Sequence, residues 1–258
     1  MLGPGRRRSR SFGTLPQSPR YLEGSHQTRT AMPMRRYLVH AAGIAAAYLA
    51  AALLLSFLQP ARFPLPVFPS SGIALAALLV FGWGFWPAVW AAGFAFATYS
   101  ILALGGPVGI QAYAAAAVIA TGVVLQAGAG HRLILRVVGF PTPLDTPRDI
   151  GLFLGLGGPV ACALGASISL FGLMGLDIVP GREWGLLWVG WWLGDAIGVL
   201  VGAPLTLILI ARPRAIWRPR MLSVAPLLTV STVLIASLML QVGPLDVRQQ
   251  HAAFRVES

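Results

Sequence analysis

The 258-residue sequence contains no lysine, only eight acidic residues and a single cysteine. Charged residues make up 10% of the chain, whereas a soluble domain carries about 25%. The lone Cys162 excludes a disulfide framework and a CxxC metal site. HExxH, GxSxG and GxxxxGK[ST] motifs are all absent, and the histidines lie on tails or at the ends of apolar runs. We therefore expect no catalytic residue, no metal and no cofactor.

Apolar residues dominate what is present, at 56% of the chain, with a mean hydropathy of +0.73. This composition indicates an all-α, polytopic transmembrane helical bundle of about seven to eight helices in the lipid bilayer. Residues 1–36 have the composition of a disordered basic tail, residues 37–242 form the integral membrane domain, and 243–258 form a carboxyl-terminal tail. The net charge of +11 is spread over the ends of apolar runs, which indicates topology signals and no nucleic-acid surface.

Seven apolar runs are candidate spans, and arginines orient them. Arg35 and Arg36 abut the first run and predict a cytoplasmic amino terminus. With seven crossings, most arginines lie on cytoplasmic segments, the outer loops hold only Arg62 and Arg182, and the carboxyl tail lies outside. The predicted spans are Tyr37–Leu58, Gly72–Phe81, Ala88–Leu104, Ala112–Gly130, Ile150–Leu176, Trp184–Ala211 and Met221–Gln241.

The second run is short, and two structures are compatible with it. The proline-rich linker Gln59–Pro69 forces extended backbone, and Ser70 or Ser71 then offers an N-cap to Gly72–Phe81. Ten helical residues extend only about 15 Å. The run is either a tilted span that borrows length from its neighbours or a half-helix that starts inside the membrane, where its free N–H groups could bind an anion. The arginine distribution favours full crossing.

An acidic residue and a line of glycines distinguish the run that begins at Trp184. Gly190, Gly194, Gly198 and Gly202 recur at every fourth position, which lets another helix come close. Asp195 lies beside this line, and a charge at that depth costs about 2.5 to 3.5 kcal/mol. The carboxyl group is either the centre of a sensing site or a fixed interhelical hydrogen bond. As a site, it would have Trp191 and Trp192 as walls and the helix start at Ser70, Ser71 and Gly72 as a further wall.

Small residues also line the span Ile150–Leu176, where Gly158 and Gly165 mark two packing faces. Pro159 should bend this helix. We expect its close neighbour to be the glycine line of the Trp184 run. Gln126 is the only strong hydrogen-bonding group of the span before it, and such a residue more often joins helices than binds a ligand. The loop His131–Arg148 should be cytoplasmic, with an interfacial turn over Arg132–Val138.

Two stretches resemble a known family. FPSSGIALAALLVFG at Phe68–Gly82, followed by Trp86-Pro87, and WWLGDAIG at Trp191–Gly198, followed by Pro204, resemble the membrane-associated sensor domain of the first MASE type. Its motifs are P-x-x-G-[IL]-A-L-A, W-P and W-x-G-D-x-x-G-x-x-x-x-x-P, and the similarity covers roughly Tyr37 to Leu240. The chain departs from the family in its seven predicted spans, where eight are usual, and in the absence of basic residues from the turn Gly82–Phe85.

The resemblance implies a sensory input module in a bacterial inner membrane. Such a module feeds a carboxyl-terminal output domain, a histidine kinase or a diguanylate cyclase, which we expect to be absent from these 258 residues. It implies a small-molecule or membrane-borne signal and a homodimer formed through the full-length receptor. The tail Asp246–Ser258 is similar to the opening of an extracytoplasmic CHASE domain.

Two alternatives to a sensory module remain open, and a third, an intramembrane protease, is excluded by its chemistry. A small permease or proton-coupled transporter needs only one buried acid, so that function stays open, as does a decayed receptor. The sequence WLGD at Trp192–Asp195 resembles the GxGD of intramembrane aspartyl proteases. That chemistry needs two carboxylates that share a proton, and no other predicted span contains Asp or Glu. We therefore predict that the protein is not an enzyme.

Overall fold

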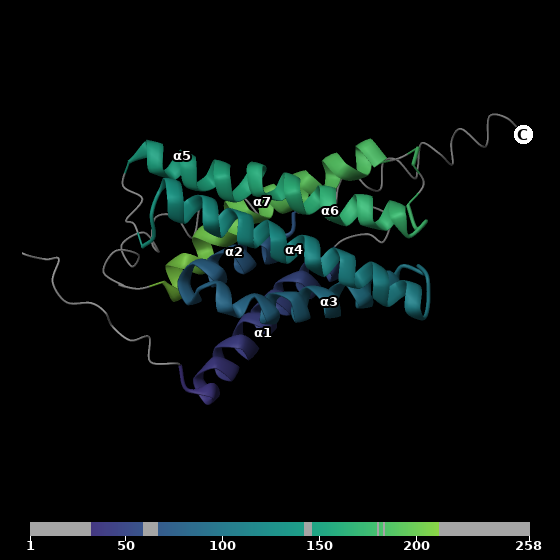
Figure 1. Ribbon diagram of the computed structural model, residues 1–258, viewed down its shortest axis with the longest axis horizontal. Helices are drawn as coiled ribbons and strands as arrows, with labels where there is room; N and C mark the ends of the chain where they lie inside the picture. Colours follow the sequence, from purple (N-terminus) through teal and green to yellow (C-terminus); the bar gives the residue numbers. More distant parts are fainter. Residues whose placement is uncertain (1–31, 59–66, 142–145, 180, 183, 212–258) are drawn as a thin grey trace, which may run out of the picture.

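The computed structural model describes residues 32–58, 67–141, 146–179, 181–182 and 184–211 (Figure 1). In these ranges the chain is helical and contains no strand. Several predicted segments lie outside the described ranges. These are residues 1–31 of the predicted amino-terminal tail 1–36, residues 59–66 of the linker Gln59–Pro69, the predicted span Met221–Gln241 and the tail 243–258. The elements are α1 (Met34–Leu58), α2 (Pro69–Phe81), the 3₁₀ turn η1 (Trp83–Phe85), α3 (Trp86–Ala103), α4 (Ile110–Val137), α5 (Pro147–Gly155), the π-helical turn η2 (Leu156–Val160), α6 (Ala161–Gly175) and α7 (Trp184–Ile210).

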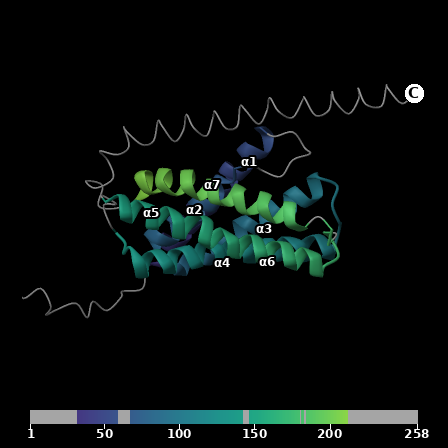
Figure 2. The same cartoon turned by 90° about the horizontal axis from the view of Figure 1, so that it is seen from above.

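The described ranges hold five helical segments long and apolar enough to cross a membrane, together with the shorter apolar helix α2. The five are α1, η1 with α3, α4, α5 continued through η2 into α6, and α7. The described part of the chain therefore supports a multi-pass membrane bundle, and the predicted count of seven to eight helices is not confirmed. Figure 2 shows the bundle from a perpendicular direction, with α4, α5, α6 and α7 running along its length.

Contacts at the two ends of the bundle establish the direction of each helix. At the end where α1 begins, the Tyr37 hydroxyl donates to the Gly84 carbonyl at 3.1 Å, and the Arg132 guanidinium lies 5.4 Å from the centre of the Trp83 ring. At the opposite end, the Gln111 amide donates to the Leu176 carbonyl at 3.1 Å. Helices α1 and α3 therefore begin at the same end of the bundle. The segment between them brings the chain back to that end, as the arginine distribution predicts. The arginines at the first end are Arg35, Arg36, Arg132, Arg136 and Arg148, whereas Arg182 lies at the other.

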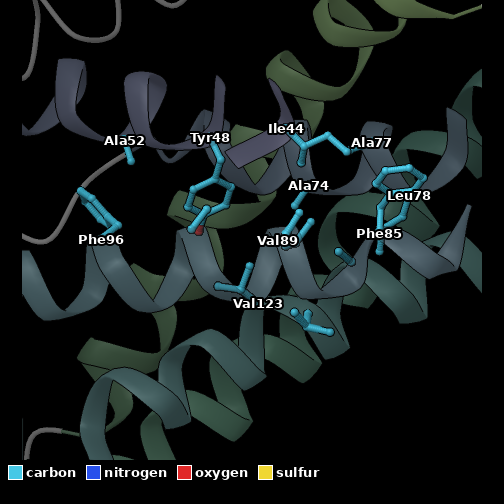
Figure 3. Close-up of a cluster of buried hydrophobic side chains, with 14 residues drawn as sticks. Ile44, Tyr48, Ala52, Ala74, Ala77, Leu78, Phe85, Val89, Phe96 and Val123 are labelled. Carbon is cyan, nitrogen blue, oxygen red and sulfur yellow. The ribbon is translucent and has the colours of Figure 1, made fainter. Parts of the chain in front are cut away.

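Helix α2 begins in the middle of the bundle. Its thirteen residues extend about 20 Å, short of the roughly 30 Å hydrocarbon core. The ring of Phe68, just before Pro69, packs against Tyr48 in the middle of α1 and Phe96 in α3. The helix itself therefore starts inside the bundle, as in the second alternative for Gly72–Phe81, and it ends beside His40 at the end where α1 begins, as the predicted crossing requires. Figure 3 shows Tyr48 and Phe96 in the apolar cluster that α1, α2, α3 and α4 share.

The glycines of α7 pack against α2. A Cβ added at Gly202 would lie 2.5 Å from the Pro69 carbonyl oxygen, and one at Gly198 would overlap the Phe68 carbonyl. The expectation that this line faces the span Ile150–Leu176 is therefore wrong for Gly198 and Gly202. A small-residue face predicts that a neighbour comes close but does not select which neighbour.

The predicted span Ile150–Leu176 consists of α5, η2 and α6, and its glycines meet two different helices. Gly165 packs against Gln126 of α4, and a Cβ at Gly158 would lie 3.6 Å from the Ala196 carbonyl oxygen of α7. Pro159 falls inside the π-helical turn. Because proline has no N–H, it interrupts the regular helical hydrogen bonds at this point.

Helix α4 extends seven residues past the predicted end of its span at Gly130. The predicted loop at His131 and the separate turn over Arg132–Val138 are therefore wrong. His131 is buried, and Arg132 and Arg136 lie exposed on the last turns of one continuous helix.

Candidate functional site

Asp195 of α7 and Ser71 of α2 meet in the buried middle of the bundle. The Ser71 hydroxyl donates to the Asp195 carboxyl at 2.5 Å, and the two residues are 2% and 4% exposed. The hydroxyl and the carboxyl group are therefore in close hydrogen-bond contact. The sequence prediction placed both residues at the site, and the structure joins them across 124 positions of sequence.

The start of α2 lies directly against the backbone of α7. The Phe68 N–H donates to the Gly194 carbonyl at 3.0 Å, and Pro69 at the first helical position has no N–H to satisfy. Glycine at 198 and 202 leaves the space that this backbone contact requires. Asp195 therefore lies beside the amino-terminal end of a helix, where the helix dipole favours a negative charge.

Ser70 and Ser71 point to opposite neighbours. Ser70 is fully buried, and its hydroxyl donates to the Tyr48 carbonyl of α1 at 3.0 Å. Since Ser71 donates to α7, the first turn of α2 is bonded to a helix on each side. Gly72, next along the chain, takes part through its lack of a side chain. A Cβ there would lie 2.6 Å from the Gly198 carbonyl oxygen.

Gln126 of α4 completes the buried polar cluster, which we define as Ser71, Gln126 and Asp195. The residue is 2% exposed, and its side chain lies in the same buried region as the Asp195 carboxyl. Its Oε1 has no hydrogen-bond partner within the described ranges and lies over Gly165 of α6. The sequence predicted a helix-joining role for Gln126 and omitted it from the site. The signal was available, because Gln126 is the only strong hydrogen-bonding residue of its predicted span.

Two tryptophans of α7 bind the preceding helical segment η2–α6. The Trp192 indole donates to the Pro159 carbonyl at 2.9 Å and stacks on Trp188, whose indole donates to Ser167 at 3.0 Å. Trp192 therefore joins α7 to η2. Trp191 is half-buried, with no hydrogen bond from its side chain in the part of the chain that is described. Gly190 is half-buried one turn before Gly194.

This geometry offers one carboxyl group with a hydroxyl and an amide from two other helices. No group of three or more His, Cys, Asp or Glu that could hold a metal occurs among the residues described. The free thiol of Cys162 is buried in the apolar cluster beside α7. The Ser71–Asp195 hydrogen bond can therefore hold α2 and α7 in register, and a change at the carboxyl group would act on both helices.

The described ranges form a helical bundle of membrane-spanning length that buries the carboxyl group of Asp195 against a half-length helix, and this fold defines the class as a multi-pass membrane domain. The family model MASE1, a membrane-associated sensor domain, matches residues 38–245. The chain therefore belongs to the MASE1 family, and the resemblance of its two motifs is confirmed. Comparison with curated proteins and with solved structures finds no match.

Proposed function

We propose that this chain is the sensory input module of a bacterial inner-membrane receptor whose output is a histidine kinase or a diguanylate cyclase. MASE1 is a membrane sensor domain of signalling receptors, and this supports the sensory role. The observation that carries the proposal for the site is the 2.5 Å bond between Ser71 and Asp195, which joins a helix that begins at mid-bundle to a long helix that crosses it.

The signal would shift α2 relative to α7. Two packings of these helices that differ by a few kcal/mol suffice, provided that the signal binds one packing better. The contact between Gly72, Gly198 and Gly202 is made by backbone atoms. A small displacement of α2 would therefore move it as a whole relative to the backbone of α7, because no flexible side chains lie between them to absorb the shift. Since α7 crosses the whole bundle, displacement at Asp195 would reach both of its ends.

The arginine distribution supports a cytoplasmic amino terminus. Arg35, Arg36, Arg132, Arg136 and Arg148 share the end at which α1 begins, and cytoplasmic loops carry the excess of basic residues. In this orientation α7 also ends on the cytoplasmic side, before the last predicted span Met221–Gln241. We expect the receptor to work as a homodimer, as dimerisation is the usual way to couple paired output domains.

Asp195→Asn in the intact receptor tests the proposal. The variant keeps the size of the side chain but removes the carboxylate that accepts from Ser71, so we expect the output to lose its response to signal while membrane insertion is retained. The measurement is kinase or cyclase activity in membranes, with protein amount determined by immunoblot. Ser71→Ala should impair the response in the same direction.

Two matched substitutions serve as controls. Asp177→Asn makes the same chemical change at an exposed loop residue, and Ser56→Ala removes a hydroxyl that bonds only to its own helix at Ala52. Both should leave the response unchanged. A normal response in Asp195→Asn would show that the carboxyl group is a structural bond and not the centre of sensing.

A proton-coupled carrier is the second candidate, because α2 is a half-helix that starts at mid-depth beside a carboxyl group. Interrupted helices of this kind form the substrate and ion sites of many transporters. Vesicles containing the chain would then acidify or take up solute in a way that Asp195→Asn abolishes. Proton flux equal to that of empty vesicles would exclude this candidate.

A further inference from the structure

The last two turns of α4 carry two arginines, and the ring of Trp83 from η1 lies beside them at one end of the bundle. Arg132 and Arg136 are one helical turn apart and both are exposed. Residues four apart lie on the same face of a helix. The Arg132 guanidinium lies 5.4 Å from the centre of the half-buried Trp83 ring, a cation–π contact that restricts its orientation.

The Trp83 ring packs directly on the backbone of α4, where Gly128 has no side chain. A Cβ added at Gly128, one turn before Arg132, would overlap the Trp83 ring. The indole therefore lies close against α4, and its ring face contacts the Arg132 guanidinium. Helix α4 has 28 residues, about 42 Å, and exceeds the roughly 30 Å hydrocarbon core, so its last turns reach the headgroup region.

Positive charge at this end is scarcely balanced by acidic residues. Helix α4 contains no Asp or Glu, and Asp149 is the only acidic residue that the described ranges place at the end shared by Arg35, Arg36, Arg132, Arg136 and Arg148. A guanidinium binds phosphate oxygens in a planar, two-point arrangement. The chemistry that complements this surface is a phosphodiester of net negative charge at the membrane interface.

We propose that Arg132, Arg136 and Trp83 form a binding site for the headgroup of an anionic phospholipid. Arg132 binds the phosphate while it is stacked on Trp83, and Arg136 adds a second positive charge one turn nearer to water. Because Trp83 follows α2 after only Gly82, a bound headgroup is coupled to the carboxyl-terminal end of the half-length helix. This inference is independent of the polar cluster at the other end of α2.

Native mass spectrometry of the full chain tests the site, after reconstitution in nanodiscs of equal phosphatidylglycerol and phosphatidylcholine. We expect the retained lipid to be enriched in phosphatidylglycerol. One arginine near the surface is worth a factor of about five, so Arg132→Gln should lower the enrichment about fivefold, and Arg136→Gln in addition should lower it further. Arg132→Lys keeps the charge but not the planar stacked geometry, and it should lose part of the enrichment.

Arg182→Gln is the matched control, because it removes an exposed arginine at the opposite end of the bundle. Its enrichment should equal that of the unchanged chain. Equal lipid ratios in Arg132→Gln and Arg182→Gln would overturn the site. Full enrichment in Arg132→Lys would overturn the stacked arrangement, since a point charge alone would then suffice.

Discussion

Replacing Gly72 by alanine tests the contact on which the arrangement of α2 and α7 depends. The new Cβ would lie 2.6 Å from the Gly198 carbonyl oxygen and 2.7 Å from the Gly202 carbonyl carbon. Ordinary van der Waals contact begins at 3.4 Å, and the backbone nitrogen of Ala203 lies closer to the new Cβ than either of these atoms, so the helices must separate by at least 3.4 less 2.6, about 0.8 Å. These atoms belong to the backbone of a helix, so they cannot rotate away as a side chain would.

The separation also acts on the buried polar cluster. If α2 takes up the whole shift along this bond, the Ser71–Asp195 distance lengthens from 2.5 Å to about 3.3 Å or more, beyond the usual range of an O–H···O bond. Overpacking of a tight interface costs about 1 to 3 kcal/mol, and one interhelical hydrogen bond in a membrane protein contributes about 0.6 kcal/mol. Alanine returns up to about 1 kcal/mol through helix propensity. We therefore expect a net loss of about 1 to 3 kcal/mol.

The assay is reversible unfolding in mixed micelles with increasing dodecyl sulfate, followed by circular dichroism. Gly43→Ala is the control, because a Cβ at that position of α1 meets no atom within 4 Å. It should match the unchanged protein or gain stability, in keeping with the higher helix propensity of alanine. Equal unfolding free energies for Gly72→Ala and Gly43→Ala would refute the close approach of α2 to α7.

Two further predictions concern the contacts of α6 and α7. Gly172→Ala should lower the unfolding free energy by about 1 to 3 kcal/mol, because its Cβ would overlap a methyl group of Val118, a residue whose rotamer is restricted in a helix. The same change in a Val118→Ala background should be nearly neutral, since the remaining atom lies at 3.4 Å, and a full loss there would contradict the contact. Trp192→Phe should lose about 1 kcal/mol with the 2.9 Å bond to Pro159, whereas Trp184→Phe, at an indole 48% exposed, should lose less in the same unfolding assay.

The sequence predicts Asp195 and Ser71 better than their neighbours, and it leaves Gln126 out of the site. Asp195 is conspicuous because an acid in an apolar run is costly. The predicted N-cap at Ser70 or Ser71 is wrong, because α2 begins at Pro69 with Phe68 as its N-cap and without a capping bond from a side chain. The acid in an apolar run and the serine after proline are both local signals, and the structure brings the two residues together. The partner of the glycine line is not a local property. Gly198 and Gly202 leave space for a backbone, and only the three-dimensional arrangement decides that Phe68–Gly72 fills it.

Helix ends near the membrane surface were the least predictable feature. Arg132 and Arg136 make the segment after Gly130 appear to be a loop, yet they lie on α4. Long arginine side chains reach the interface from a helix that continues past the hydrocarbon core, so a charge marks the membrane boundary and not the end of the helix. The hydrogen bond of Trp192 was also not predictable from the sequence, because its acceptor, the Pro159 carbonyl, lies 33 residues earlier in the chain.

The half-length helix α2 combines these features in one element. A helix of about 20 Å does not match the hydrocarbon core, so its position depends on contacts with protein at both of its ends. Its first turn is held by Ser70 to α1 and by Ser71 to α7. Beyond its last turn, Trp83 packs on α4 at Gly128. An element whose place is set by a few contacts at two ends can be moved by a change at either end, which supports the proposal that the signal acts on α2.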